Sequence, residues 1–190
     1  MKALKITQNA IRINFFAFPL RHEIFFHDIL LQAMAEHLYL VRRSMIRQAT
    51  TEDASRIAEI SIFTKRMNYR SIYHNDKVSF REMQVYPLAD SYIHDPQQLQ
   101  GIWVFDDEFV NGFINIDGRR IAELYVDSFF ENQGIGSRLL SFAVTKGCNA
   151  LWVLEKNTDA QRFYSKHGFV KTGERKVEEG TDEYIIEMKR

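Results

Sequence analysis

The feature that most constrains this chain is a pair of glycines between a strand-like and a helix-like segment. Residues Ile121 to Asp127 have the pattern of a strand, and Gly134 and Gly136 precede a helix-like run from Gly136 to Lys146. Two glycines separated by one residue let the backbone turn tightly and expose several N–H groups at the start of a helix. Because the positive end of the helix dipole lies there too, the segment predicts a phosphate site, with an ordinary turn as the alternative.

A strand and a short helix follow this turn. Residues Ala150 to Leu154 read as a buried strand, Asn157 stands at its exit, and Thr158 is the predicted N-cap of a helix from Asp159 to His167. Apolar and aromatic side chains share one face of that helix: Ala160, Phe163 and Tyr164. We expect Gly168 to end the helix, because glycine readily adopts the left-handed conformation.

Together the two segments resemble the GCN5-related N-acetyltransferase (GNAT) family. That family has a glycine loop and, about twenty residues later, the pattern Asn-x-x-Ala-x-x-Phe-Tyr-x-x-x-Gly-Phe, which stands here from Asn157 to Phe169. The resemblance covers residues 45–190 and implies an α+β fold with a mixed central sheet flanked by helices. In such a sheet an antiparallel meander is followed by one parallel, splayed strand pair. The resemblance also implies an acyltransferase that uses acetyl-coenzyme A (acetyl-CoA) as co-substrate.

The order of the other predicted elements agrees with a mixed sheet. The strands that end at Val126 and Leu154 are joined by a crossover helix, so they should lie side by side and parallel. Alternation and turn residues predict strands over 46–49, 102–105, 109–116, 119–126, 170–172 and 184–188. Helical spacing predicts a helix over 53–63, capped by Thr51, with Ile57, Ile60 and Phe63 on its inner face. A second helix or helix pair is predicted over 69–83.

The resemblance implies where acetyl-CoA binds. In the family the two parallel strands splay apart, and the pantetheine arm pairs with backbone groups in the gap, here Leu124, Tyr125 and Val126. The pyrophosphate lies on the glycine loop, here Asn132, Gln133, Gly134, Ile135, Gly136, Ser137 and Arg138. Arg138 either adds a charge-assisted phosphate contact or is a solvated helix residue. Glu131 stands where the family usually has Gln or Arg, so we expect its carboxylate to face the solvent.

Acetyl transfer to an amine requires that the amine loses a proton, that the oxyanion is stabilised and that the departing thiolate is protonated. The resemblance places Tyr164 near the cofactor sulfur as the acid, with an aromatic packing residue as the alternative. It implies a backbone N–H of Leu124 or Tyr125 as the oxyanion donor. Asn157 is expected to hydrogen-bond the pantetheine arm or an ordered water, or else to be a turn residue. Direct attack in a ternary complex needs no covalent enzyme intermediate.

The general base is less well defined by the sequence. Glu123 is an acidic residue in an otherwise apolar strand, and alternation puts it on the same face as Tyr125. It is the candidate base, acting through a water. As an alternative, it pairs with Arg119, Arg120 or a cationic substrate. Asp127 is a second candidate base that reads more naturally as a turn former.

The acceptor is expected to bind along residues 63–92. Aromatic and basic residues cluster there: Arg66, Tyr69, Arg70, Tyr73, His74, Tyr86 and Tyr92. Such a lining suits a small amine or an amino-acid-like acceptor with a carboxylate, although the same residues also suit packing against the sheet. We therefore predict a small-molecule primary amine as acceptor. A protein or peptide N-acetyltransferase and a non-catalytic acyl-CoA sensor are the alternatives.

Composition excludes several other classes of function. The formal net charge is +0 at pH 7, so no nucleic-acid or anionic-membrane surface is expected. The six histidines are scattered without ligand spacing, which predicts no metal site. Cys148 is the only cysteine, which favours the cytoplasm, and we expect it to be a small buried residue.

His167 is expected to be a cation at a helix C-terminus. A homodimer remains open as an alternative to a monomer.

The first 44 residues do not share the pattern of the rest of the chain. They contain no uninterrupted run of about 18 apolar residues, so no membrane span is expected there. We expect residues 1–44 to be an extension outside the acetyltransferase domain at 45–190, either a helical appendage or sequence upstream of a working start at Met45. As an alternative, the segment binds a partner or a second copy, because its phenylalanines need burial: Phe15, Phe16, Phe18, Phe25 and Phe26.

Overall fold

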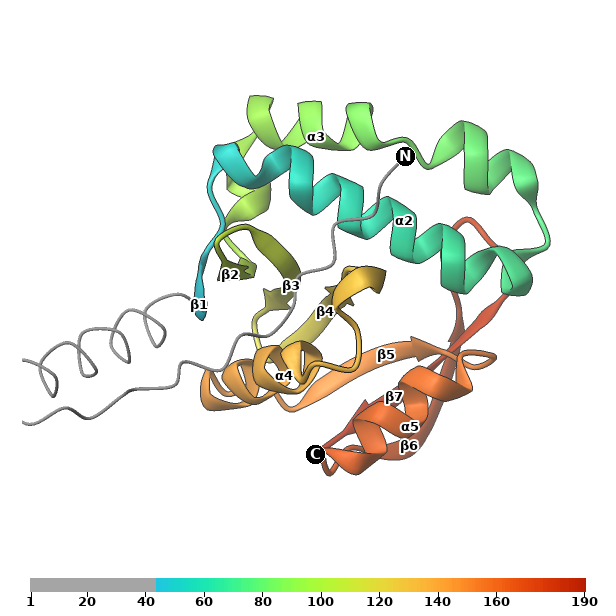
Figure 1. Cartoon of the computed structure of the whole chain (residues 1–190). Helices are drawn as coiled ribbons and strands as arrows, with labels where there is room; N and C mark the ends of the chain where they lie inside the picture. The colour runs from blue at the N-terminus through green and yellow to red at the C-terminus, as the bar shows by residue number, and fades with distance from the viewer. Residues whose placement is uncertain (1–43) are drawn as a thin grey trace, which may run out of the picture. The chain divides into compact units, whose positions relative to one another are not determined.

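The computed structural model describes residues 44–190 (Figure 1). The expectations for residues 1–43 therefore lie outside the described residues. Within the described part of the chain, no helix is long and apolar enough to cross a lipid bilayer.

The strands form one mixed seven-stranded sheet in the order β1-β2-β3-β4-β5-β7-β6. Their bounds are Ser44–Gln48 (β1), Ile102–Asp107 (β2), Val110–Asp117 (β3), Arg120–Val126 (β4), Ala150–Leu154 (β5), Val170–Val177 (β6) and Tyr184–Lys189 (β7). Glu108, at the turn between β2 and β3, adopts a positive φ of 69°. All neighbours are antiparallel except β4 and β5, which are parallel. The predicted fold class is confirmed.

The parallel pair separates soon after it begins. Pairing between β4 and β5 is limited to Arg120 with Ala150 and Ile121 with Leu151. The helix α4 (Ile135–Thr145) connects the two strands. Both strands continue for several residues beyond the last pair, so their C-terminal halves diverge. This is the splayed geometry that the family resemblance implies.

Helices cover both faces of the sheet, because neighbouring residues of a strand point to opposite faces. On β3, Phe113 is buried with Ile57 and Ile60 of α2, whereas the adjacent Ile114 is buried with Leu139 of α4. In Figure 1, α2 and α3 lie above the sheet and α4 and α5 lie below it. Cys148 is buried in the core on the α4 side, as expected.

The helices differ from the prediction mainly between residues 63 and 94. The helix α2 spans Ala54–Tyr73, so it is longer than predicted, and Phe63 is exposed rather than on the inner face. It ends at His74, which is left-handed with a φ of 49°. The predicted second helix or helix pair over 69–83 is not a separate element: residues 69–73 are the end of α2, and a π-helical turn, Val78–Glu82, follows. The helix α3, Val85–His94, was not predicted.

Two predicted helix caps are wrong by one residue. Thr50, not Thr51, caps the first helical turn, and its backbone N and side-chain Oγ1 both donate to the carboxylate of Asp53. The helix α5 spans Thr158–Lys166, and its N-cap is Asn157, whose Oδ1 accepts from the N–H of Ala160 at 3.1 Å. Asn and Thr are both good caps, so residue preference alone does not separate them.

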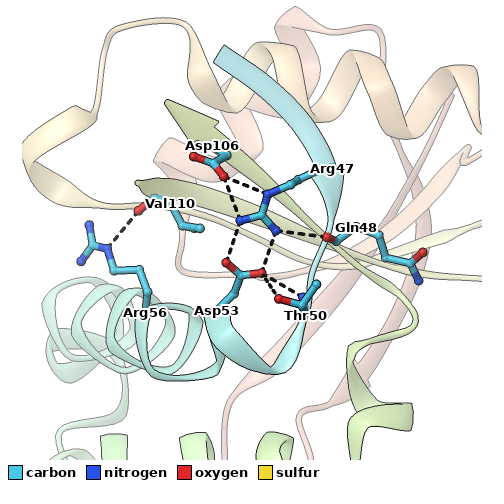
Figure 2. Close-up of polar contacts among 7 residues, drawn as sticks. All are labelled: Arg47, Gln48, Thr50, Asp53, Arg56, Asp106 and Val110. Atoms are coloured by element: carbon cyan, nitrogen blue, oxygen red, sulfur yellow. Dashed lines mark hydrogen bonds and ion pairs between the residues drawn. The ribbon is translucent and has the colours of Figure 1, made fainter. Parts of the chain in front are cut away.

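The N-terminal end of α2 is fixed to the sheet by ion pairs (Figure 2). The guanidinium of Arg47 on β1 donates to both carboxylate oxygens of Asp53 at 2.7 and 2.8 Å and to Asp106 of β2 at 2.8 Å. Burial opposes ionisation of Asp53, but hydrogen bonds from Arg47 and Thr50 outweigh it and lower the pKa of Asp53. The network therefore holds the start of α2 on the edge of the sheet that β1 and β2 form.

Candidate active site

A cleft of about 1110 Å³ lies where β4 and β5 diverge. Its walls are the second half of α2, the residues of β4 from Ile121 to Val126, the glycine loop, the end of β5 and the first turns of α5. The splayed strands thus open directly onto the predicted phosphate loop.

The glycine loop presents the N-terminus of α4 to this cleft. Gly134 is left-handed, with a φ of 83°, and the first helical hydrogen bond runs from the N–H of Arg138 to the carbonyl of Gly134 at 3.0 Å. The N–H groups of Ile135, Gly136 and Ser137 therefore have no acceptor within the helix. Together with the helix dipole, they form a cradle that suits an anion.

Five of the seven predicted loop residues line the cleft: Asn132, Gly134, Ile135, Gly136 and Ser137. Gln133 and Arg138 do not. The side chain of Gln133 is exposed and donates to the carbonyl of Phe129, and the guanidinium of Arg138 lies 4.5 Å from the centre of the Phe105 ring. Glu131 is exposed, as expected, at the rim of the cleft.

Strand alternation divides the β4 side chains between the two faces, as predicted. Leu124 and Val126 pack against the α4 core, whereas Glu123 and Tyr125 face α2. All four line the cleft. Sequence reasoning correctly placed Glu123 beside Tyr125 but named the wrong ion-pair partners.

Glu123 pairs with Lys65 of α2, whose Nζ lies 3.0 Å from its Oε1. Arg120 instead donates to Glu187 of β7 at 3.0 Å. The Tyr125 hydroxyl lies 3.3 Å from that of Tyr69, and burial raises the pKa of both phenols. Glu123 therefore sits in a pocket wall that combines a lysine with two neutral phenols.

Tyr164 lies on α5 across the cleft from these residues and is half-buried. Its ring contacts Phe163 and Phe169 edge-on. Burial, and to a lesser degree the nearby Tyr69, raises the pKa of the Tyr164 phenol, which therefore carries its proton at neutral pH. Asn157 also lines the cleft, with its side-chain oxygen already used to cap α5.

The other predicted groups have structural contacts. Asp127 does not line the cleft: one of its oxygens accepts from the N–H of Phe129 and the other pairs with Arg56, as suits a turn former. His167 makes specific contacts rather than acting only as a terminal cation. Its Nδ1 lies 2.8 Å from the carbonyl of Phe163, and its Nε2 lies 3.0 Å from the hydroxyl of Ser137.

Only two residues of the predicted acceptor cluster line the cleft, Tyr69 and Tyr73. The others lie elsewhere: Tyr92 is buried in the core, Tyr86 is 78% exposed, Arg66 donates to the carbonyls of Ser79 and Met83, and Arg70 pairs with Asp76. Lys65 was missed, although it stands four and eight residues before Tyr69 and Tyr73 and so shares their helix face. Within residues 44–190, no cluster of His, Cys, Asp and Glu side chains is placed to hold a metal.

Comparison with known proteins agrees with this geometry. Residues 98–171 match the family described as "Acetyltransferase (GNAT) domain". The chain is 33% identical over 85 residues to peptidyl-lysine N-acetyltransferase YjaB of Salmonella typhimurium, a match that covers 44% of this chain and 59% of that relative. The chain thus spans under two thirds of the length of this curated relative.

Solved structures show the same fold over most of the chain. The solution structure of apo YjaB from Escherichia coli matches with a TM-score of 0.61 and 22% identity, covering 77% of this chain and 96% of that one. The PaiA N-acetyltransferase of Thermoplasma acidophilum, solved in complex with coenzyme A, matches with a TM-score of 0.54 and 22% identity, covering 77% and 99%. The resemblance inferred from the sequence is confirmed: residues 98–171 match a GNAT acetyltransferase domain, and the chain shares its fold with these solved structures.

Proposed function

We propose that this protein is an N-acetyltransferase that transfers the acetyl group of acetyl-CoA directly to a primary amine, with residues 45–190 as its catalytic domain. The observation that carries the proposal is that the splayed ends of β4 and β5 and the exposed N–H groups of α4 line the same cleft. A pantetheine-like chain and a pyrophosphate need these two surfaces at the same time.

The residues of the cleft suit acetyl-CoA. Leu124, Tyr125 and Val126 lie beyond the last pair with β5, so the side of β4 that faces away from β3 is open there to a pantetheine arm. The N–H groups of the loop would hold the pyrophosphate, and the absence of side chains at Gly134 and Gly136 lets a phosphate approach the backbone. The PaiA relative is solved with coenzyme A, which supports the same ligand here.

Acetyl-CoA supplies an acetyl thioester, whose transfer requires one proton acceptor at the amine and one proton donor at the sulfur. Tyr164 is the proposed donor, because burial keeps its phenol protonated. Glu123 is the proposed acceptor, since its carboxylate already contacts an amine, that of Lys65. A backbone N–H of Leu124 or Tyr125 is the proposed oxyanion donor.

A small primary amine is the proposed acceptor. Tyr69 and Tyr73 narrow the α2 side of the cleft with aromatic walls, which suits a small molecule. The name of the Salmonella relative supports a second candidate, the lysine side chain of a peptide. A non-catalytic acyl-CoA sensor would bind the same cofactor without turnover.

Thiol release from acetyl-CoA tests the proposal, measured against a panel of small amines, amino acids and lysine peptides. We expect turnover with one acceptor class and a loss of about 100-fold or more in kcat for Tyr164→Phe. Tyr86→Phe is the matched control, because Tyr86 is exposed and does not line the cleft. Turnover that Tyr164→Phe leaves unchanged would remove the proposed acid. Cofactor binding without turnover on any acceptor would favour the sensor.

A further inference from the structure

One amine of the protein itself lies in the cleft beside the proposed base. The Nζ atom of Lys65 is 3.0 Å from Oε1 of Glu123 and 5.5 Å from the centre of the Tyr125 ring. Its side chain is 26% exposed and lines the same cleft as Tyr164. Lys65 is therefore held by the carboxylate that we propose takes the proton of the acceptor.

The second lysine of the cleft lies in a different setting. Lys156 pairs at 2.7 Å with Glu183, which does not line the cleft. Lys77, in the connection between α2 and α3, does not line the cleft and is 67% exposed. Only Lys65 thus combines, among the described lysines, a place in the cleft with contact to Glu123.

We propose that Lys65 is an acetylation site that the protein modifies itself, within one molecule. This inference rests on the proposed function, because it uses the same acetyl donor, base and acid. It differs in the acceptor, which is here a side chain of α2 rather than an external amine.

The atoms of this step balance. A bond forms between Nζ of Lys65 and the acetyl carbon, and the carbon–sulfur bond of the thioester breaks, which leaves N-acetyl-lysine and the free thiol of coenzyme A. The ammonium of Lys65 loses two protons in becoming an amide. Glu123 takes one and passes it to solvent, and the other balances the proton that Tyr164 gives to the sulfur.

Acetylation would also change the cleft. An amide is uncharged, so the ion pair with Glu123 and the cationic contact with the Tyr125 ring are both lost. The modified side chain would keep its place on α2 beside Tyr69. The wall of the cleft around Glu123 would then carry less positive charge than in the unmodified protein.

The test is to incubate the full chain with acetyl-CoA and no acceptor, followed by peptide mapping by mass spectrometry. We expect one added acetyl group, on the peptide that contains Lys65, at a rate independent of protein concentration. Lys65→Arg should abolish that mass shift while keeping the positive charge beside Glu123, and Lys77→Arg, the matched control, should leave it unchanged. Tyr164→Phe should slow the modification in parallel with turnover of an external amine.

Two outcomes would overturn the proposal. The first is an unmodified Lys65 in a preparation that acetylates an external amine, which leaves the proposed function intact. The second is acetylation spread equally over exposed lysines such as Lys77, which is chemical modification by the thioester. Failure of the proposed function is recognised by a third measurement, the binding of acetyl-CoA. A protein that does not bind acetyl-CoA can neither modify Lys65 nor acetylate an external amine.

Discussion

The guanidinium of Arg56 on α2 lies 2.5 Å from the carboxylate of Asp127 at the exit of β4. The same guanidinium donates through Nε to the carbonyl of Val110 at 2.9 Å. The other oxygen of Asp127 accepts from the N–H of Phe129, at the start of the segment that leads into the glycine loop. Arg56 thus connects α2 to the strand and the loop that form two walls of the cleft.

Asp127→Asn should destabilise the protein and weaken the binding of acetyl-CoA. The carboxylate is 12% exposed, so its removal leaves the partly buried Arg56 with only the exposed carboxylate of Glu59 as an ion-pair partner. We expect a loss of about 2 kcal/mol in the free energy of unfolding, measured with denaturant. Glu59→Gln is the control, because Glu59 is the exposed partner of the same arginine and should change stability by less than about 0.5 kcal/mol. Equal effects of both substitutions would contradict this role of Asp127.

The pair of Ser137 and His167 should tie the phosphate cradle to the helix of Tyr164. A carbonyl only accepts, so Nδ1 of His167 donates to Phe163, and Nε2 shares a hydrogen bond with the hydroxyl of Ser137. We expect Ser137→Ala and His167→Phe to weaken acetyl-CoA binding non-additively, with a coupling of about 0.5–1 kcal/mol in a double-mutant cycle by calorimetry. His167→Gln, which keeps an acceptor, should lose less. Additive effects would show that the two side chains act separately.

Glu123→Gln should reduce turnover without preventing acetyl-CoA binding. The amide keeps the size of the carboxylate but cannot take a proton, so we expect kcat/KM for the amine to fall by about 100-fold or more. Glu131→Gln is the control, because Glu131 is an exposed carboxylate at the rim of the same cleft. Steady-state kinetics on both variants decide the role, and an unchanged kcat/KM in Glu123→Gln would exclude Glu123 as the base.

Acid should destabilise the fold partly through Asp53. Hydrogen bonds from Arg47 and Thr50 outweigh burial and hold the folded pKa of Asp53 below its ordinary value of 3.8. The stabilisation is therefore fully present above about pH 4 and is lost as the pH falls through the folded pKa. Asp53→Asn should lower stability at neutral pH and flatten its decrease below pH 4, whereas Asp182→Asn, at an exposed loop position, should keep the slope. Denaturant unfolding across this pH range measures the free energy of unfolding of both variants. If this free energy depends on pH equally in Asp53→Asn and in the unaltered chain, Asp53 does not contribute to the acid sensitivity.

The parts of the fold that follow local patterns could be predicted from the sequence. Gly134 and Gly136, the buried strand Ala150–Leu154 and the helix that ends before Gly168 each carry their own signal, and the crossover rule fixes the direction of the strand pair. The strand β6 was predicted too short, because it is exposed along its whole length and lacks the alternation that marks a half-buried strand.

The partners across the cleft could not be predicted in the same way. Beyond residue 63, the side chains of Lys65, Tyr69 and Tyr73 on α2 line the cleft, and none of the three is fully buried. The apolar periodicity that reveals a helix therefore weakens, and the predicted helix ended too early. The pairing of Glu123 with Lys65 joins residues 58 positions apart and depends on how α2 crosses the sheet. Sequence alternation gave the face of Glu123 but not the residue opposite it.

Calorimetric titration of acetyl-CoA into the full chain tests most directly the claim that the cleft between β4, β5 and α4 is a cofactor site. We predict one site per chain and at least about tenfold weaker binding by Gly136→Asp, whose carboxylate would oppose a pyrophosphate. That variant should fold, because a Cβ at Gly136 would make ordinary contact with the Phe163 ring at 3.5 Å. Absence of acetyl-CoA binding to the unaltered chain, or equal affinity in Gly136→Asp, would contradict the account.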